Sequence, residues 1–152
     1  MRVSAKADYA VRAAIELAAA GDTGPVKGDR VATAQDIPLR FLENILGEMR
    51  HAGLVQSQRG AVGGYWLARP ASEITVAEVI RAVEGPLASV RGERPESLDY
   101  HGASEPLQSV WLALRANIRG ILEEVTLADI VEGTLPPSVA KLVDMPEAWQ
   151  PH

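Results

Sequence analysis

The chain has 152 residues, of which 47% are hydrophobic and none is cysteine, and its formal net charge at pH 7 is −5. This length supports one sizeable core. The apolar runs are short and interrupted by charges, which argues against a membrane span. No signal-type apolar segment lies near Met1, and we therefore predict a cytoplasmic protein. Residues 1–70 contain 9 Lys and Arg against 7 Asp and Glu, whereas residues 71–152 contain 6 Lys and Arg against 13 Asp and Glu. The acidic charge therefore lies in the second half of the chain, and the first half can still bind nucleic acid.

The first predicted element is a long helix that begins after Ser4, whose hydroxyl can cap it. Its apolar positions recur every three or four residues, and the predicted buried stripe consists of Ala7, Ala10, Val11, Ala14, Ile15 and Ala18. The glycines and proline of residues 21–25 end this helix. A short helix over residues 29–34 and a turn over 35–37 are predicted to follow.

Residues 37–69 change from a helical to an extended period. The helical part, residues 38–51, has one predicted buried face that is made of Phe41, Leu42, Ile45, Leu46 and Met49. Pro38 suits the first turn of this helix, and Gly53 supplies its stop. Two short strands are predicted at residues 54–55 and 65–67, around a turn at 59–64 whose glycines permit positive φ.

The opposite face of the 38–51 helix is polar and holds Arg40, Glu43, Asn44 and Gly47. Arg, Asn and Glu side chains can address guanine, adenine and cytosine edges in the major groove. An ordinary solvated face and a plain tight turn are the alternatives, but Arg59 at the hairpin tip is well placed for a phosphate or the minor groove. Three helices followed by a basic hairpin predict a mainly α fold, a winged helix-turn-helix over residues 1–84.

Residues 85–104 are rich in Gly, Pro and Ser and have no clear periodicity, which predicts an irregular, sensor-type loop. His101 lies close in sequence to Glu96, Asp99, Tyr100 and Glu105. A small-molecule pocket or a site for a hard metal is one reading of this group. A solvated loop is the favoured alternative, because carboxylates and a single His without regular spacing are weak evidence for a metal site.

A long helix is predicted from Glu105, within a dimerisation segment over residues 105–132. Its apolar positions are spaced four and three apart and form a heptad seam, predicted as the dimer interface, of Leu107, Trp111, Leu114, Ile118, Ile121 and Val125. The alternative is that the helix packs only onto its own domain. The C-terminal tail, residues 133–152, is predicted to include a short helix over 138–143 and then to fray.

Several motifs together closely resemble the Rrf family of bacterial winged helix-turn-helix regulators (IscR- and NsrR-like). They are S-x-K-x-x-Y-A-V at 4–11, I-P with F-L-E at 37–43, G-L-V-x-S-x-R-G-x-x-G-G-Y at 53–65, and I-T-V-x-E-V-I-x-A-V-E-G at 74–85. The resemblance implies a homodimeric, sequence-specific transcription factor, usually a repressor, that binds a palindromic operator in double-stranded DNA. The DNA contacts that it implies are Lys6, Tyr9, Leu39, Arg40, Glu43, Asn44, Ser57, Arg59 and Gly60.

The chain departs from the iron–sulfur members of that family, because it has no cysteine. Cluster irons need thiolate ligands, and the positions where the resemblance would place them hold Gly92, Leu98 and Glu105. Asp8 matches a carboxylate that completes the cluster in one branch, and Arg12 replaces a His of another. We therefore expect no iron–sulfur cluster, no other cofactor and no metal site, and interpret Asp8 as a first-turn acidic residue favoured by the helix dipole.

These patterns are compatible with two classes of function and argue against a third. A DNA-binding regulator is the leading interpretation, with an unknown small-molecule or protein effector as a further partner. The alternative is a winged-helix module that regulates by docking a partner protein. An enzyme is not expected, since the chain has neither a HExxH motif nor a nucleophile elbow and no catalytic residue is predicted.

Overall fold

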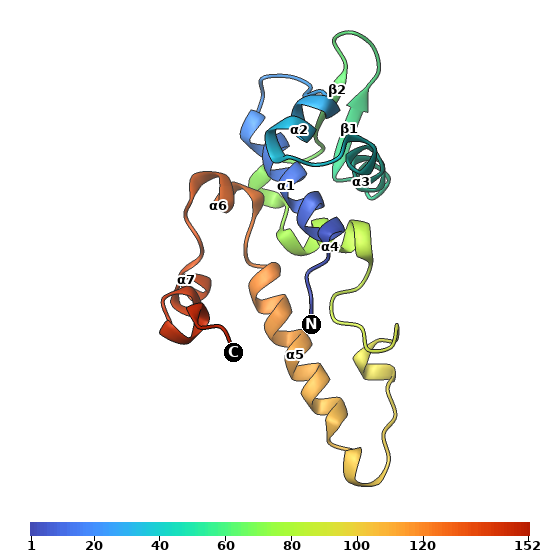
Figure 1. Cartoon of the computed structure of the whole chain (residues 1–152), viewed down its shortest axis with the longest axis vertical. Coiled ribbons are helices and arrows are strands. Elements are labelled where there is room, and N and C mark those ends of the chain that lie inside the picture. Colours follow the sequence, from blue (N-terminus) through green and yellow to red (C-terminus); the bar gives the residue numbers. More distant parts are fainter.

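The computed structural model describes residues 1–152 and is mainly helical, with one two-stranded antiparallel sheet (Figure 1). In chain order the helices and strands are α1 (Ala5–Ala20), α2 (Gly28–Gln35), α3 (Leu39–His51), β1 (Val55–Gln58), β2 (Gly64–Leu67), α4 (Val76–Glu84), α5 (Leu107–Leu122), α6 (Leu127–Glu132) and α7 (Pro137–Val143). None of the helices combines the length and apolarity that crossing a membrane requires. The predicted winged helix-turn-helix fold is confirmed.

Helix α1 lies at the centre of the molecule, in contact with α2, α3, α4 and α6. Ser4 caps it as predicted, because its Oγ accepts the Ala7 N–H at 3.0 Å. The small buried side chains of Ala7, Ala10, Ala13 and Ala14 let the neighbouring helices approach closely. The main core therefore forms around α1, and α3 contributes Leu42, Ile45, Leu46 and Met49 to it.

Phe41 does not belong to this core, and its prediction as a buried residue of α3 is wrong. Its side chain is 46% exposed. Successive helical residues are rotated by about 100°, which leaves Phe41 at the margin of the apolar stripe. It packs edge-on against Tyr9 of α1 instead of pointing between the helices.

The wing, β1 and β2 with the turn between them, is longer than predicted. Val55 pairs with Leu67 and Gln58 with Gly64, so β1 begins after Leu54 and reaches Gln58. An additional pairing joins β2 to the chain before α2: the Val26 N–H donates to Tyr65 O at 2.9 Å, and the Tyr65 N–H donates to Val26 O at 2.8 Å. This pairing attaches the wing to the helix-turn-helix.

Helix α4 is held by a capping box, since Thr75 Oγ1 accepts the Glu78 N–H and Glu78 Oε2 accepts the Thr75 N–H. Burial raises the pKa of Glu78, but the hydrogen bonds from the Thr75 backbone and from Arg69 outweigh it and leave the pKa below its usual value. The cap thus favours the ionised carboxylate at neutral pH.

The chain returns to the winged-helix core after α5, which changes the predicted division at residue 105. The Val76 N–H donates to Val125 O at 3.0 Å, and the Leu127 N–H donates to Ile74 O at 2.9 Å. Leu127 of α6 is fully buried in the main core. Of the segment 105–132, only α5 stands apart from the winged-helix body, where it extends away from the other helices in Figure 1.

Helix α7 agrees with the short helix predicted in the tail. Its Val139 forms a second, smaller cluster with Val76 and Val125. Val125 lies beyond the last residue of α5 and is only 6% exposed. Its prediction as part of a seam between two chains is therefore not consistent with this structure, because Val125 is enclosed by its own chain.

Candidate nucleic-acid interface

The outward face of α3 carries polar side chains in the arrangement that the sequence predicts. Arg40, Glu43 and Asn44 are all exposed, opposite the buried stripe. Gly47 lies on the same face, and a Cβ built on it would meet no atom within 4 Å. This face therefore presents a cation, a carboxylate and an amide, and its middle is open to close approach by another molecule.

The two flanks of α3 are joined to neighbouring elements by polar contacts. On one side Lys6 Nζ of α1 lies 2.9 Å from Glu48 carboxylate oxygens. On the other side Arg50 Nη1 donates to Ser57 Oγ of β1 at 3.1 Å. Both Lys6 and Ser57 thus lie beside α3, as the predicted set of DNA contacts requires.

Arg50 was not among the residues predicted for the interface. It is exposed at the C-terminal end of α3, where it bridges the helix and the wing. The sequence places Arg50, three residues before Gly53, in the last turn of this helix, where the helix dipole stabilises a positive charge. Nothing local in the sequence indicates that its side chain reaches β1.

Tyr9 and Leu39 lie at the edges of the same surface. Tyr9 is half-buried between Phe41 and Arg12, whose guanidinium carbon is 4.8 Å from the centre of the Tyr9 ring. Leu39 is the first residue of α3 and is 43% exposed. The structure accordingly places all the predicted helix residues on or beside one surface.

The wing tip projects beyond this surface (Figure 1). Arg59 and Gly60 are exposed there, and Arg59 takes part in no ion pair. Gly60 has a backbone φ of +107°, a value that residues with a Cβ rarely adopt. A cation without a partner on a narrow hairpin can approach a phosphate or enter a groove.

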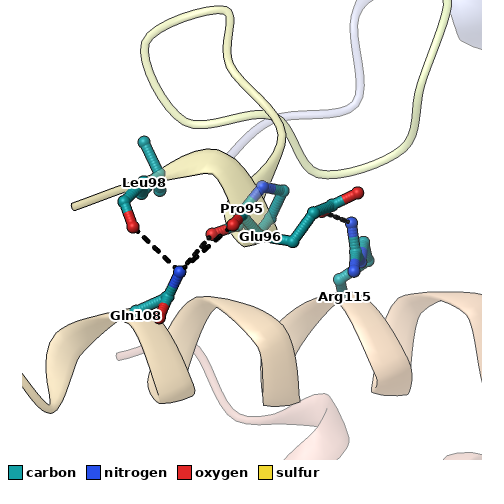
Figure 2. Close-up of polar contacts among 5 residues, drawn as sticks. All are labelled: Pro95, Glu96, Leu98, Gln108 and Arg115. Carbon is teal, nitrogen blue, oxygen red and sulfur yellow. Dashed lines mark hydrogen bonds and ion pairs between the residues drawn. The ribbon is translucent and has the colours of Figure 1, made fainter.

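The stretch 85–104 contains no α-helix or strand, and most of its residues are exposed, in keeping with the favoured expectation, although parts of it are attached to the fold. Leu87, Pro95 and Leu98 are buried. Figure 2 shows how α5 holds this segment: Gln108 Nε2 donates to the carbonyl oxygens of Pro95, Glu96 and Leu98 at 3.3, 3.4 and 2.8 Å.

An ion pair also attaches this segment to α5. Arg115 forms an ion pair with Glu96 (Figure 2). Hydrogen bonds from the Glu96 backbone and from Arg115 lower the pKa of the Glu96 carboxyl. His101 and Asp99 are exposed and 3.7 Å apart, and they belong to no group of three potential metal ligands.

Helix α5 exposes an apolar surface that differs in part from the predicted heptad seam. None of its residues is buried. Trp111, a predicted seam residue, turns toward its own chain, where its Nε1–H donates to Tyr100 Oη at 3.0 Å. Val110 is 54% exposed; its spacing of three from Leu107 and four from Leu114 is a signal that could have identified it.

Comparison with known proteins gives one consistent picture. A family model described as "Rrf2: Iron-dependent Transcriptional regulator" matches residues 3–133. A Mycobacterium tuberculosis protein named among HTH-type transcriptional regulators is 53% identical over 144 residues, which cover 95% of this chain and 89% of that protein. The HTH-type transcriptional regulator IscR of Cereibacter sphaeroides is 36% identical over 92% of this chain and 93% of its own length.

Solved structures agree with these relatives. The structure of CymR, described as the global cysteine regulator of Bacillus subtilis, has a TM-score of 0.75 and 31% identity and covers 88% of this chain and 98% of its own. IscR from T. potens has a TM-score of 0.72 and 34% identity, covering 95% of this chain and 92% of its own.

Proposed function

We propose, since this chain belongs to the Rrf2 family of DNA-binding HTH-type transcriptional regulators, that it acts as a homodimer that binds a palindromic operator and represses transcription there. Membership of the family makes the chain a DNA-binding regulator and not an enzyme. The dimer, the repression and the individual DNA contacts are our proposal. Repression is supported by the family resemblance alone.

The observation that carries the dimer is the exposed apolar surface of α5. This 16-residue helix has no buried residue, although Leu107, Val110, Leu114 and Ile118 follow one another along it at helical spacing. Such a surface favours association, because burying it removes apolar area from water. Two-fold pairing of α5 would place two copies of α3 on successive half-sites of a palindrome.

Within each half-site, α3 is the element suited to the major groove. Arg40, Glu43 and Asn44 would contact base edges, and Gly47 would allow the helix to lie close to them. The remaining proposed contacts would position the protein on the phosphates or in the minor groove: Lys6, Tyr9, Leu39, Ser57, Arg59 and Gly60.

Two substitutions separate these roles. Arg59→Ala is expected to weaken binding at every sequence and to reduce the slope of log affinity against log salt by about one, because one phosphate or minor-groove contact is lost. Asn44→Ala should instead change the base preferred at one position of each half-site, by about 1–3 kcal/mol.

DNA selection from a random pool, followed by binding measurements at several salt concentrations, checks both results. If neither substitution changes affinity or preference on the operator selected by the wild-type protein, the proposed docking is wrong. If the wild-type protein enriches no sequence at all, the operator model fails as a whole.

We also propose that this regulator works without an iron–sulfur cluster, although the family is described as iron-dependent. The donor set does not fit a cluster: the chain has no thiolate, and the positions where the resemblance would place thiolates include Gly92, which has no side chain, and the apolar Leu98. Carboxylate and imidazole groups only supplement thiolates in such clusters, and this chain has no thiolate for them to supplement.

Protein purified without oxygen is therefore expected to be colourless, with no stoichiometric iron or sulfide. Its operator affinity should be the same with and without air. Metal analysis, visible absorption and paired binding curves measure these properties. Stoichiometric iron accompanied by cluster-type absorption would contradict the proposal.

A further inference from the structure

Phe41 presents an aromatic ring on the helix proposed to read DNA. Its 46% exposure is high for an apolar residue inside a helix that otherwise buries its apolar stripe. A groove of about 800 Å³ lies between this side of α3 and the end of α4, and Phe41 borders it together with Asn44, Gly47 and Lys6. The ring thus shares one concave surface with residues proposed to contact DNA.

The ring is also held firmly from behind. Tyr9 meets it edge-on, with ring centroids 5.8 Å apart and an interplanar angle of 84°. Arg12 lies over the Tyr9 ring, and its guanidinium donates to Gln35 O at 2.6 Å and lies 3.0 Å from the Asp8 carboxylate. Because these contacts restrain the ring, little conformational freedom remains to be lost when a ligand meets it.

The order of chemical groups on this surface matches one kind of base pair. Phe41 and Asn44 are three residues apart, so their side chains are neighbours on the helix. In the major groove an A·T pair presents adenine N7 and N6, which an Asn amide can contact with two hydrogen bonds, and beside them the thymine C5-methyl group. An amide next to an exposed apolar ring is complementary to that edge, and Gly47 leaves the space beside them open.

We propose that Phe41 is a specificity-determining residue that contacts the C5-methyl group of a thymine, in or next to the A·T pair whose adenine Asn44 contacts. The inference rests on the proposed major-groove docking of α3. Tyr9 acts here as a positioning residue, because it supports the Phe41 ring.

Replacement of each thymine of the selected operator by deoxyuridine, one symmetric pair of positions at a time, tests the proposal. This change removes one methyl group and leaves all base-pair hydrogen bonds intact. For wild-type protein, deoxyuridine is expected to weaken binding at one of these positions, by about fourfold per half-site, because one buried methyl group is lost. Phe41→Ala should bind the thymine operator with that same loss and should show no further loss on deoxyuridine at that position.

Leu39→Ala is the matched control, because Leu39 is an apolar residue of α3 with similar exposure on the other flank of the helix. Because Leu39 is itself a proposed contact, Leu39→Ala is expected to lower the affinity for both operators equally and to keep the full thymine-to-deoxyuridine ratio at the position assigned to Phe41. Thermal unfolding shows whether the Phe41→Ala variant folds. If that variant does not fold, Phe41→Leu is used in its place, and the discrimination between thymine and deoxyuridine is then expected to be lost only in part.

The wild-type scan alone can overturn the inference. If wild-type protein binds its selected operator equally with thymine and deoxyuridine at every position, Phe41 contacts no methyl group, while the proposed function stands. If Phe41→Ala discriminates the two bases as well as wild type, another residue makes the contact. If wild-type protein selects no operator, the proposed function and this inference fail together.

Discussion

Replacing Val110 and Leu114 together by glutamate is expected to convert the protein to a monomer and to abolish binding to a palindromic operator. Both residues lie on the exposed apolar surface of α5, and Val110 is 54% exposed within its own chain. The substitutions therefore add charge to the proposed interface without disturbing a core. In the dimer they would put four carboxylates into one apolar seam, where unpaired charges are strongly disfavoured.

Light scattering at micromolar concentration and operator-binding curves measure this result. Far-UV circular dichroism should show that the helical content is kept, since the winged-helix core is remote from both positions. Ser109→Glu with Ala116→Glu is the matched control: it adds the same charge to exposed positions of α5 that lie off the apolar stripe. A Val110→Glu, Leu114→Glu variant that remains dimeric would exclude α5 as the interface.

Gly64→Ala is expected to detach the wing from the helix-turn-helix and to lower the stability of the protein. A Cβ on Gly64 would lie 2.6 Å from Val26 O and 2.7 Å from Val26 C, which is far inside normal contact distance. Those atoms belong to backbone that is fixed by the Val26–Tyr65 pairing, so they cannot move without breaking it. Overpacking of this kind costs about 1–3 kcal/mol.

Urea unfolding measures that cost, and operator affinity should fall at least as much as in Arg59→Ala, because the whole wing is displaced. Gly47→Ala is the contrasting control. Its added methyl meets nothing within 4 Å and lies inside α3, so stability should rise by about 0.5–1 kcal/mol, whereas operator binding should weaken because the reading face is crowded. Equal stability of wild type and Gly64→Ala would show that the Val26–Tyr65 pairing does not hold the wing.

Much of the fold follows from the sequence because its signals are local. Ser4 caps α1 through a backbone group three residues away, and the buried stripe of α3 is visible in the spacing of Leu42 and Ile45. Gly60 permits the wing turn through its own φ. Each of these features depends on the chain within one or two turns, so it can be derived before any tertiary contact is known.

The tertiary structure decided which partner each helix face meets. The periodicity of α3 counts Phe41 as apolar but does not show that Tyr9, 32 positions earlier in the chain, lies beside it and keeps it at the surface. Similarly, a heptad pattern continues through Val125, yet the chain folds back after Leu122 and encloses that residue.

The same physical reason applies to the segment before α5 and to the wing. Gln108 fixes residues 95–98 through backbone carbonyls, which any sequence would offer, and Val26 joins β2 through a two-bond pairing that has no side-chain signature. Such contacts join backbone groups that are distant in sequence, so their geometry arises only when the chain is folded. The sequence by itself determined the winged-helix elements and their chemistry, and the tertiary contacts decided which of their side chains remain free to meet DNA or a second chain.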